Sequence, residues 1–258
     1  MLIDEVAERV VNEVRGLGVM VVDECMGVKY TYVRVYGEGG ESLGIAFTDC
    51  GELEHHEFVE GVSVDSLTDL VRSPKVYYKV WGAALLNALS QYLIFRAGLK
   101  VFRELVIGRD VLDIIPLNEV STAVVVGFVG PVVRGLRERG VKVMVTERGL
   151  RRACVGDAYV DTALPRLARG AELAVITGAS IVNDSIDAAL EAVRDVPIKA
   201  VVGPTAQYVP YQEVMRRYGI DYVASIHVTS PDRAADVVKH GGGTKQIMRY
   251  SRKYVVVT

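Results

Sequence analysis

The stretch that most constrains the fold is 122–147, with the sequence TAVVVGFVGPVVRGLRERGVKVMVTE. An apolar, β-branched run ends at Gly127, a short turn carries Gly130, and an amphipathic helical pattern follows. A second apolar run then ends at an acidic residue, Glu147. This order predicts the opening of a parallel α/β sheet. Because ligands of such sheets bind beyond the carboxyl ends of the strands, it also predicts where a site lies.

The overall composition is that of a globular protein and argues against several classes of partner. Half of the 258 residues are hydrophobic, 24% are charged, and the formal net charge is -2. This balance favours neither nucleic acid nor a membrane as a partner. The cysteines Cys25, Cys50 and Cys154 form no CxxC pair, which argues against a zinc–thiolate site and a disulfide framework. Because the N-terminal pattern is an acidic amphipathic helix and no uncharged apolar run reaches about 18 residues, we expect a cytoplasmic protein.

Residues 1–115 are expected to form a smaller α+β domain. The apolar period predicts a helix over Ile3–Leu17, and Val28–Tyr36 alternates as a strand that pairs with a second strand beginning at Gly44. A long apolar helix is predicted over Pro74–Ala97, because proline suits the first helical turn. One more helix is expected over Leu99–Leu112.

Residues 116–258 alternate strictly between strand and helix patterns, which predicts a Rossmann-like α/β domain with helices on both faces of a parallel sheet. The expected strands are Ala123–Val126, Val141–Val145, Leu173–Thr177, Ala200–Val202 and Tyr222–Ile226, with Tyr254–Thr258 as a further edge strand. The expected helices are Pro131–Arg139, Thr162–Ala168, Asn183–Arg194, Pro210–Tyr218 and Pro231–His240.

The turn after the first parallel strand, Gly127-Phe128-Val129-Gly130-Pro131, has two interpretations. It is either a tight strand-to-helix turn or a loop whose glycines let a ligand approach the backbone near a helix N-terminus. The full GxGxxG dinucleotide fingerprint is absent, and proline removes one amide donor.

Glu147 ends the second parallel strand, about 20 residues after the glycine loop. Nucleotide-binding sheets place the acid that binds the ribose hydroxyls at this position. The alternative is a solvated or ion-paired acid at the end of a strand.

Small polar residues also follow the later strands. Ser180 or Asn183 could cap the next helix instead of facing a ligand. His227 could bind a metal or move protons, or be a hydrogen-bonded structural residue. The candidates at these ends are Thr177, Gly178, Ser180 and Asn183, then Pro204 and Thr205, and finally His227 and Thr229.

Four further features outside these strand ends could contribute to a site. Tyr30 lies on an alternating strand, and Asn87 lies inside an otherwise apolar helix, where a buried amide needs partners. His55, His56 and Glu57 are adjacent and form at most a weak metal site. Gly241–Lys245 is either a helix stop or a loop that bends over a ligand.

Several stretches resemble the heavy-metal-chelation family, whose members join a small enolase-N-terminal-like domain to a Rossmann-like domain. The resemblance covers nearly the whole chain and is most specific in the C-terminal half. The matching stretches are GVKYTYV (27–33), SPKVYYKVWGAALLNALS (73–90), VVVGFVGPVVRGLRERGVKVMVTER (124–148), AELAVITGASIVNDSIDAAL (171–190), VVGPTAQYVP (201–210) and IHVTSPDRAADVVKHGGGTKQIMRY (226–250).

The resemblance implies a cleft between the two domains, lined by the strand-end residues named above and, from the small domain, by Tyr30 and Asn87. Two departures from the family pattern stand out. The loop Cys50–Gly61 lacks the shorter, glycine-rich form expected there, and the chain has only four histidines and scattered cysteines for a metal.

Three functions compete at this point. The first is binding or conversion of a small polar ligand, nucleotide-like or amino-acid-like, in the interdomain cleft. The second is metal handling without catalysis, which requires at least three of Glu147, His227, His55, His56 and Asp157 to converge. The third is an assembly module in which the apolar helix Tyr77–Ile94 forms a homodimer. The cofactor is accordingly a nucleotide-like ligand or a divalent metal, and whether the protein is an enzyme stays open.

Overall fold

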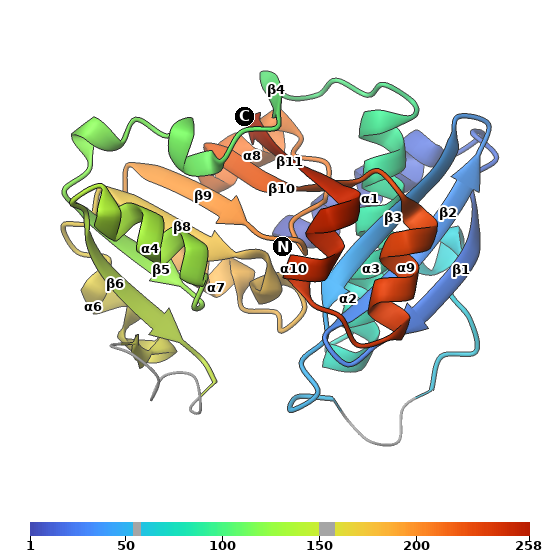
Figure 1. Ribbon diagram of the computed structural model, residues 1–258, viewed down its shortest axis with the longest axis horizontal. Coiled ribbons are helices and arrows are strands. Elements are labelled where there is room, and N and C mark those ends of the chain that lie inside the picture. The colour runs from blue at the N-terminus through green and yellow to red at the C-terminus, as the bar shows by residue number, and fades with distance from the viewer. Residues whose placement is uncertain (54–57, 150–157) are drawn as a thin grey trace.

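The chain folds around two sheets, as seen in a computed structural model that describes residues 1–53, 58–149 and 158–258 (Figure 1). The smaller sheet is antiparallel, in the order β1 (Met20–Met26), β2 (Tyr30–Gly37) and β3 (Gly40–Phe47). Helices α1 (Leu2–Val14), α2 (Leu67–Arg72) and α3 (Val76–Phe95) pack together on one face of it. Among the described residues, no helix is both long and apolar enough to cross a membrane.

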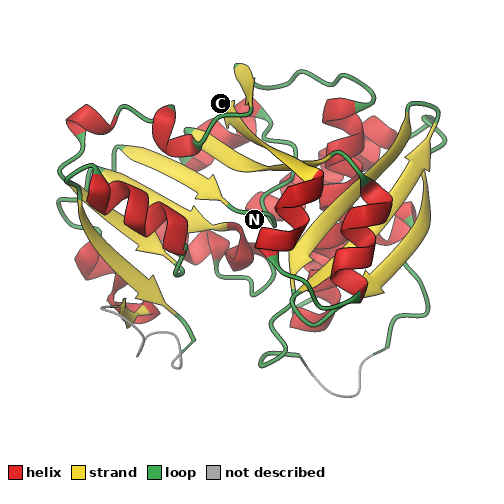
Figure 2. Cartoon of the chain, viewed as in Figure 1, coloured by secondary structure: helices red, strands yellow, loops and turns green. Residues whose placement is uncertain are grey.

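In the described part of the chain the larger sheet has eight strands (Figure 2). Strands β5 to β10 are parallel to one another, β11 runs antiparallel to β10, and β4 runs antiparallel to β11. Its order is β4-β11-β10-β9-β8-β5-β6-β7, so the chain order reverses between β5 and β8. Counted from β5, the parallel strands follow the doubly wound order 3-2-1-4-5-6. The strands are β4 (Glu104–Ile107), β5 (Thr122–Val126), β6 (Lys142–Glu147), β7 (Ala158–Val160), β8 (Leu173–Thr177), β9 (Ile198–Val202), β10 (Tyr222–Val228) and β11 (Ser251–Val257).

Side chains of the central strands alternate between the two faces of this sheet, as strand geometry requires. Val125 packs on the face covered by α4 (Gly130–Glu138) and by two 3₁₀ turns, Val111–Asp113 and Leu117–Glu119. Val124 packs on the opposite face, against α6 (Leu164–Leu167), α7 (Ile186–Ala192) and α8 (Gln212–Tyr218). The mixed α/β fold, with a small antiparallel sheet and a large, mostly parallel one, confirms the predicted fold class.

The C-terminal segment returns to the small sheet. Helices α9 (Pro231–Lys239) and α10 (Thr244–Ile247) lie beside β1 to β3 in Figure 1, on the face opposite α3. There Val238 packs in one cluster with Tyr32 and Ile45. The sequence pattern does not reveal this crossing, because an amphipathic helix can bury its apolar face on either sheet.

Two sequence predictions of secondary structure are wrong. The segment Leu99–Leu112 is not a helix but contains strand β4, which pairs with β11. The C-terminal strand is therefore not at the sheet edge, because β4 lies beyond it. The helix expected over Thr162–Ala168 is present, as the 3₁₀ turn Asp161–Ala163 followed directly by the short α6. Strands β1 and β7 were not anticipated. The domain boundary at residue 115 stays a prediction.

Helix α3 is buried almost all round, and it approaches the small sheet most closely at Gly44. A Cβ atom there would lie 2.0 Å from the backbone nitrogen of Ala88 and 2.4 Å from the carbonyl oxygen of Ala84. These are backbone atoms, which cannot move aside without displacing the helix. The contact therefore requires glycine for reasons of space.

We expect Gly44→Ala to lower the free energy of unfolding by about 3 kcal/mol, at the upper end of overpacking effects. Gly61→Ala is the matched control, because its Cβ would meet only Glu24 Oε1 at 4.0 Å. Urea unfolding of both variants measures the difference. Equal stability of the two would show that α3 does not press against Gly44.

Candidate functional site

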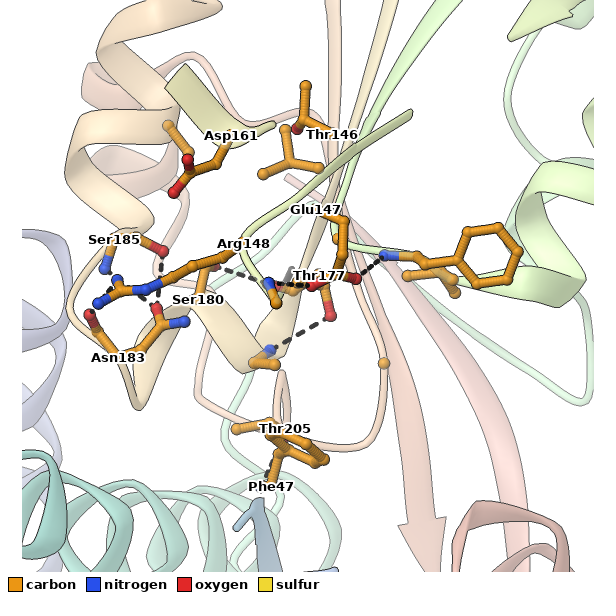
Figure 3. A pocket seen from close by; sticks show the side chains of 18 of the residues that line it. Phe47, Thr146, Glu147, Arg148, Asp161, Thr177, Ser180, Asn183, Ser185 and Thr205 are labelled. Carbon is orange, nitrogen blue, oxygen red and sulfur yellow. Dashed lines mark hydrogen bonds between the residues drawn. The ribbon is translucent and has the colours of Figure 1, made fainter. Parts of the chain in front are cut away.

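A cavity of about 700 Å³ opens at the carboxyl ends of β5, β6, β8 and β9, with residues of the small sheet at its border (Figure 3). It contains the point at which the strand order reverses, the usual ligand position in such sheets. Its volume is typical of a small-molecule site. The predicted residues that line it are Tyr30, Gly127, Phe128, Gly130, Glu147, Thr177, Ser180, Asn183, Pro204 and Thr205.

The glycine loop after β5 is held in one conformation. Gly127 has a φ of 80°, which favours glycine, and a Cβ there would lie 2.5 Å from Thr177 Cγ2. Its amide donates to the carbonyl oxygen of Thr146 at 2.8 Å, and the Val129 amide donates back to Gly127 at 2.9 Å. The loop is therefore a tight turn that also lines the cavity, and the approach of a ligand to its backbone stays a prediction.

Glu147 joins the loops that follow β5 and β6. Its Oε2 accepts the Phe128 amide at 2.9 Å, and its Oε1 accepts the Gly149 amide at 3.2 Å. Figure 3 shows these contacts, with the carboxylate between the two loops. The side chain is half-buried and lines the cavity, so an acid stands where the sequence predicts the ribose-binding residue.

The loop after β8 is ordered by its own side chains. Ser180 Oγ donates to the Thr177 carbonyl at 2.6 Å, and Ser185 Oγ donates to Asn183 Oδ1 at 2.7 Å. The carboxamide oxygen of Asn183 is thereby occupied, and in Figure 3 its nitrogen points away from Ser185 into the cavity. Asn183 consequently presents a hydrogen-bond donor. Gly178 is not among the lining residues, although its neighbours Thr177 and Ala179 are. A Cβ at Gly178 would lie 2.7 Å from the backbone nitrogen of Ala206.

The loop after β9 connects the cavity to the small sheet. Thr205 Oγ1 accepts the Phe47 amide at 2.9 Å, and the Thr205 carbonyl accepts Asn87 Nδ2 at 2.8 Å. Asn87 is fully buried and does not line the cavity. It therefore holds the cavity wall in place and does not face a ligand.

The small sheet and the C-terminal segment form the opposite border. The hydroxyl groups of Tyr30 and Thr244 are hydrogen-bonded at 2.7 Å, and both residues line the cavity. Thr244 follows the three glycines that the sequence analysis singled out as a loop over a ligand. Lys245, the last residue of that segment, is not among the lining residues.

Four charged residues of the lining were missed by the sequence analysis. They are Asp49, Glu52, Arg148 and Asp161. Arg148 Nε pairs with Glu52 Oε1 at 2.9 Å, which links the loop after β6 to the loop after β3. The sequence feature that could have indicated Arg148 as a lining residue is its position directly after the predicted acid Glu147. Asp49 and Glu52 approach only through the tertiary fold.

His227 and Thr229 lie outside the cavity lining. The His227 ring stacks on Phe95 with centroids 3.8 Å apart, and its Nδ1 lies 3.1 Å from Gln91 Oε1. Burial, with smaller contributions from Arg96 and Arg252, lowers the pKa of His227 to about 4. Thr229 Oγ1 donates to the Tyr250 carbonyl at 3.1 Å. The position of His227 matches the structural alternative, and its role as a metal ligand stays a prediction.

The described residues do not fit a heavy-metal centre. No three histidine, cysteine, aspartate or glutamate side chains in the ranges 1–53, 58–149 and 158–258 converge as metal ligands. His55, His56 and Asp157, which were expected to contribute, lie outside the described residues. Burial raises the pKa of Cys25, which disfavours the thiolate that metals bind, and Cys50 Sγ contacts the Val28 carbonyl at 3.2 Å.

Comparison with known proteins assigns the chain to a family. Residues 110–257 match DUF364 and residues 7–90 match DUF4213, both described as "Putative heavy-metal chelation". This two-part α/β chain therefore belongs to the DUF364 family.

Three relatives resemble the chain over nearly its full length. An uncharacterised protein of Methanocaldococcus jannaschii is 27% identical over 267 residues, covering 99% of this chain and 98% of the relative. A solved DUF364 structure of unknown function from Pyrococcus horikoshii is 27% identical, with a TM-score of 0.86 and complete coverage of both chains. Another solved DUF364 structure, from Desulfitobacterium hafniense, is 18% identical and has a TM-score of 0.76. The match covers 98% of this chain and 97% of that chain. The last shows the shared fold alone.

The lowered pKa of His227 predicts a pH-dependent stability. Between about pH 6.5 and pH 4 the unfolded chain binds a proton at this residue and the folded chain does not. The free energy of unfolding should therefore fall as the pH is lowered through this window. The slope corresponds to less than one proton, because the ring is partly exposed.

Denaturant titrations of wild type and His227→Gln at several pH values test this. The variant should lose part of the acid sensitivity. His240→Gln is the control, because His240 is exposed on the surface. An unchanged slope in His227→Gln would contradict burial of a neutral imidazole.

Proposed function

We propose that the protein binds a small ligand that contains a ribose, with the Glu147 carboxylate as acceptor for the ribose hydroxyls. The observation that carries this proposal is the position of Glu147, which ends β6 beside the strand-order reversal and faces the cavity. An acid at this strand end is the recognised partner of ribose in doubly wound sheets.

The hydrogen-bonding capacity of Glu147 supports the proposal. An ionised carboxylate offers about four acceptor positions on its two oxygens. The amides of Phe128 and Gly149 use one on each oxygen. The remaining positions can accept hydroxyl hydrogens, and the two amides hold the carboxylate still while they do so.

The other walls suit the rest of a nucleoside. Apolar side chains from α6 and α7 line one side of the cavity and can cover the face of a base: Leu164, Pro165, Ala188, Ala189 and Ala192. Asn183 adds a donor for a ring nitrogen or a carbonyl oxygen. A mostly apolar wall with a few directed polar groups is the usual composition of such pockets.

Adenosine and its 2′-deoxy and 3′-deoxy analogues test the proposal. We expect isothermal titration calorimetry to show binding of adenosine and a loss of about tenfold or more for the missing hydroxyl, because a carboxylate–hydroxyl bond is charge-assisted. Glu147→Ala should bind all three weakly and equally.

Glu138→Ala is the control, because this exposed carboxylate ends α4 away from the cavity. It should bind as wild type does. Circular dichroism of each variant shows whether the fold is kept. Equal affinity of wild type for adenosine and both deoxy analogues would remove ribose recognition from this site.

A further inference from the structure

The glycine loop differs from a phosphate-binding loop in where its amides point. Dinucleotide sites leave these amides free to hold a pyrophosphate at the helix N-terminus. Here the amides of Gly127 and Val129 bond to backbone oxygens, and Pro131 has none. The Phe128 amide is occupied by Glu147, 2.9 Å away. A carboxylate of the protein therefore occupies one of the loop amides that a ligand phosphate would use.

The charge of the cavity also opposes an anion. The described lining residues carry four carboxylates, Asp49, Glu52, Glu147 and Asp161, against one guanidinium, Arg148. That guanidinium already pairs with Glu52 at 2.9 Å. The lining residues that the structure describes thus carry three more negative than positive charges, which disfavours a phosphate. A cation would be attracted by the same groups.

Two buried oxygen atoms of the cavity lining lack a hydrogen-bond partner among the described residues. Thr146 is fully buried, lines the cavity, and its Oγ1 has no hydrogen-bond partner among the described residues. Glu52 Oε2 is also buried and accepts no hydrogen bond from the residues that the structure describes, although its Oε1 pairs with Arg148. Buried carboxylate oxygens without donors are costly. A positively charged, donor-bearing ligand group would lower that cost.

We propose that this cavity selects a nucleoside that carries positive charge and no phosphate. The inference rests on the proposed ribose recognition and adds the charge of the ligand. The selection against nucleotides comes from Glu147 itself, which occupies the Phe128 amide. One carboxylate thus both accepts the ribose hydroxyls and excludes a phosphate from the glycine loop.

S-adenosylmethionine and S-adenosylhomocysteine provide a pair of probes that differ by a methyl group and one positive charge. Adenosine and AMP provide a pair that differs by a phosphate. We expect calorimetry on the full chain to show at least tenfold tighter binding of S-adenosylmethionine than of S-adenosylhomocysteine. Adenosine should bind at least tenfold more tightly than AMP.

Glu147→Gln removes the charge and keeps one acceptor oxygen for the Phe128 amide, while the weaker contact with the Gly149 amide is lost. The affinity ratio of S-adenosylmethionine to S-adenosylhomocysteine and that of adenosine to AMP should both fall severalfold in this variant. Both ratios should be unchanged in Glu138→Gln. Raising the salt concentration should also shrink them, since the effect is electrostatic.

The outcomes separate the two proposals. Binding of AMP equal to or tighter than adenosine would overturn the charge selection while leaving ribose recognition in place. Equal affinity for S-adenosylmethionine and S-adenosylhomocysteine would also overturn the charge selection and leave ribose recognition in place. Failure of adenosine and S-adenosylmethionine alike to bind would remove both proposals.

Discussion

The edge of strand β3 that faces the large sheet is bonded by side chains instead of by another strand, and the placement of the two sheets depends on it. The Ile45 amide donates to Gln207 Oε1 at 2.8 Å, and the Ile45 carbonyl accepts Asn87 Nδ2 at 2.8 Å. Asn87 Nδ2 also donates to the carbonyl oxygen of Thr205. The hydroxyl oxygen of Thr205 in turn accepts the Phe47 amide. These groups are buried, so loss of any one would leave a costly unpaired partner. The network therefore fixes the loop after β9, and with it one wall of the cavity, relative to the small sheet.

The same principle organises the cavity itself. Glu147 satisfies the amides of two loops, and the pair of Arg148 with Glu52 joins a loop of the large sheet to a loop of the small one. The side chains that would recognise a ligand are thus already held by backbone contacts. Such preorganisation lowers the ordering cost of binding. In the proposal made above, the acidic lining selects among the ligands that fit this site.

Much of the fold could be predicted from the sequence, because each of strands β5, β6, β8, β9 and β10 has its own apolar run and turn. The candidate site followed from them, since carboxyl ends of parallel strands share one edge of the sheet. Prediction failed where a segment's structure depends on a distant partner. Glu104–Ile107 is a strand because β11 pairs with it. His227 also ends a parallel strand, but β10 lies away from the strand-order reversal, beside Phe95 and Gln91 of α3.

The sequence by itself determined the class of the fold, the succession of five of the parallel strands, and the glycine loop and acid that follow the first two of them. These depend on local periodicity and on backbone conformations that only certain residues adopt. Only the tertiary structure decided that α9 covers the small sheet, that Asn87 supports a wall instead of facing a ligand, and that Asp49 and Glu52 join Glu147 and Asp161 around one cavity. Those outcomes depend on which buried surfaces and polar groups meet across long sequence separations, and no local pattern encodes that choice.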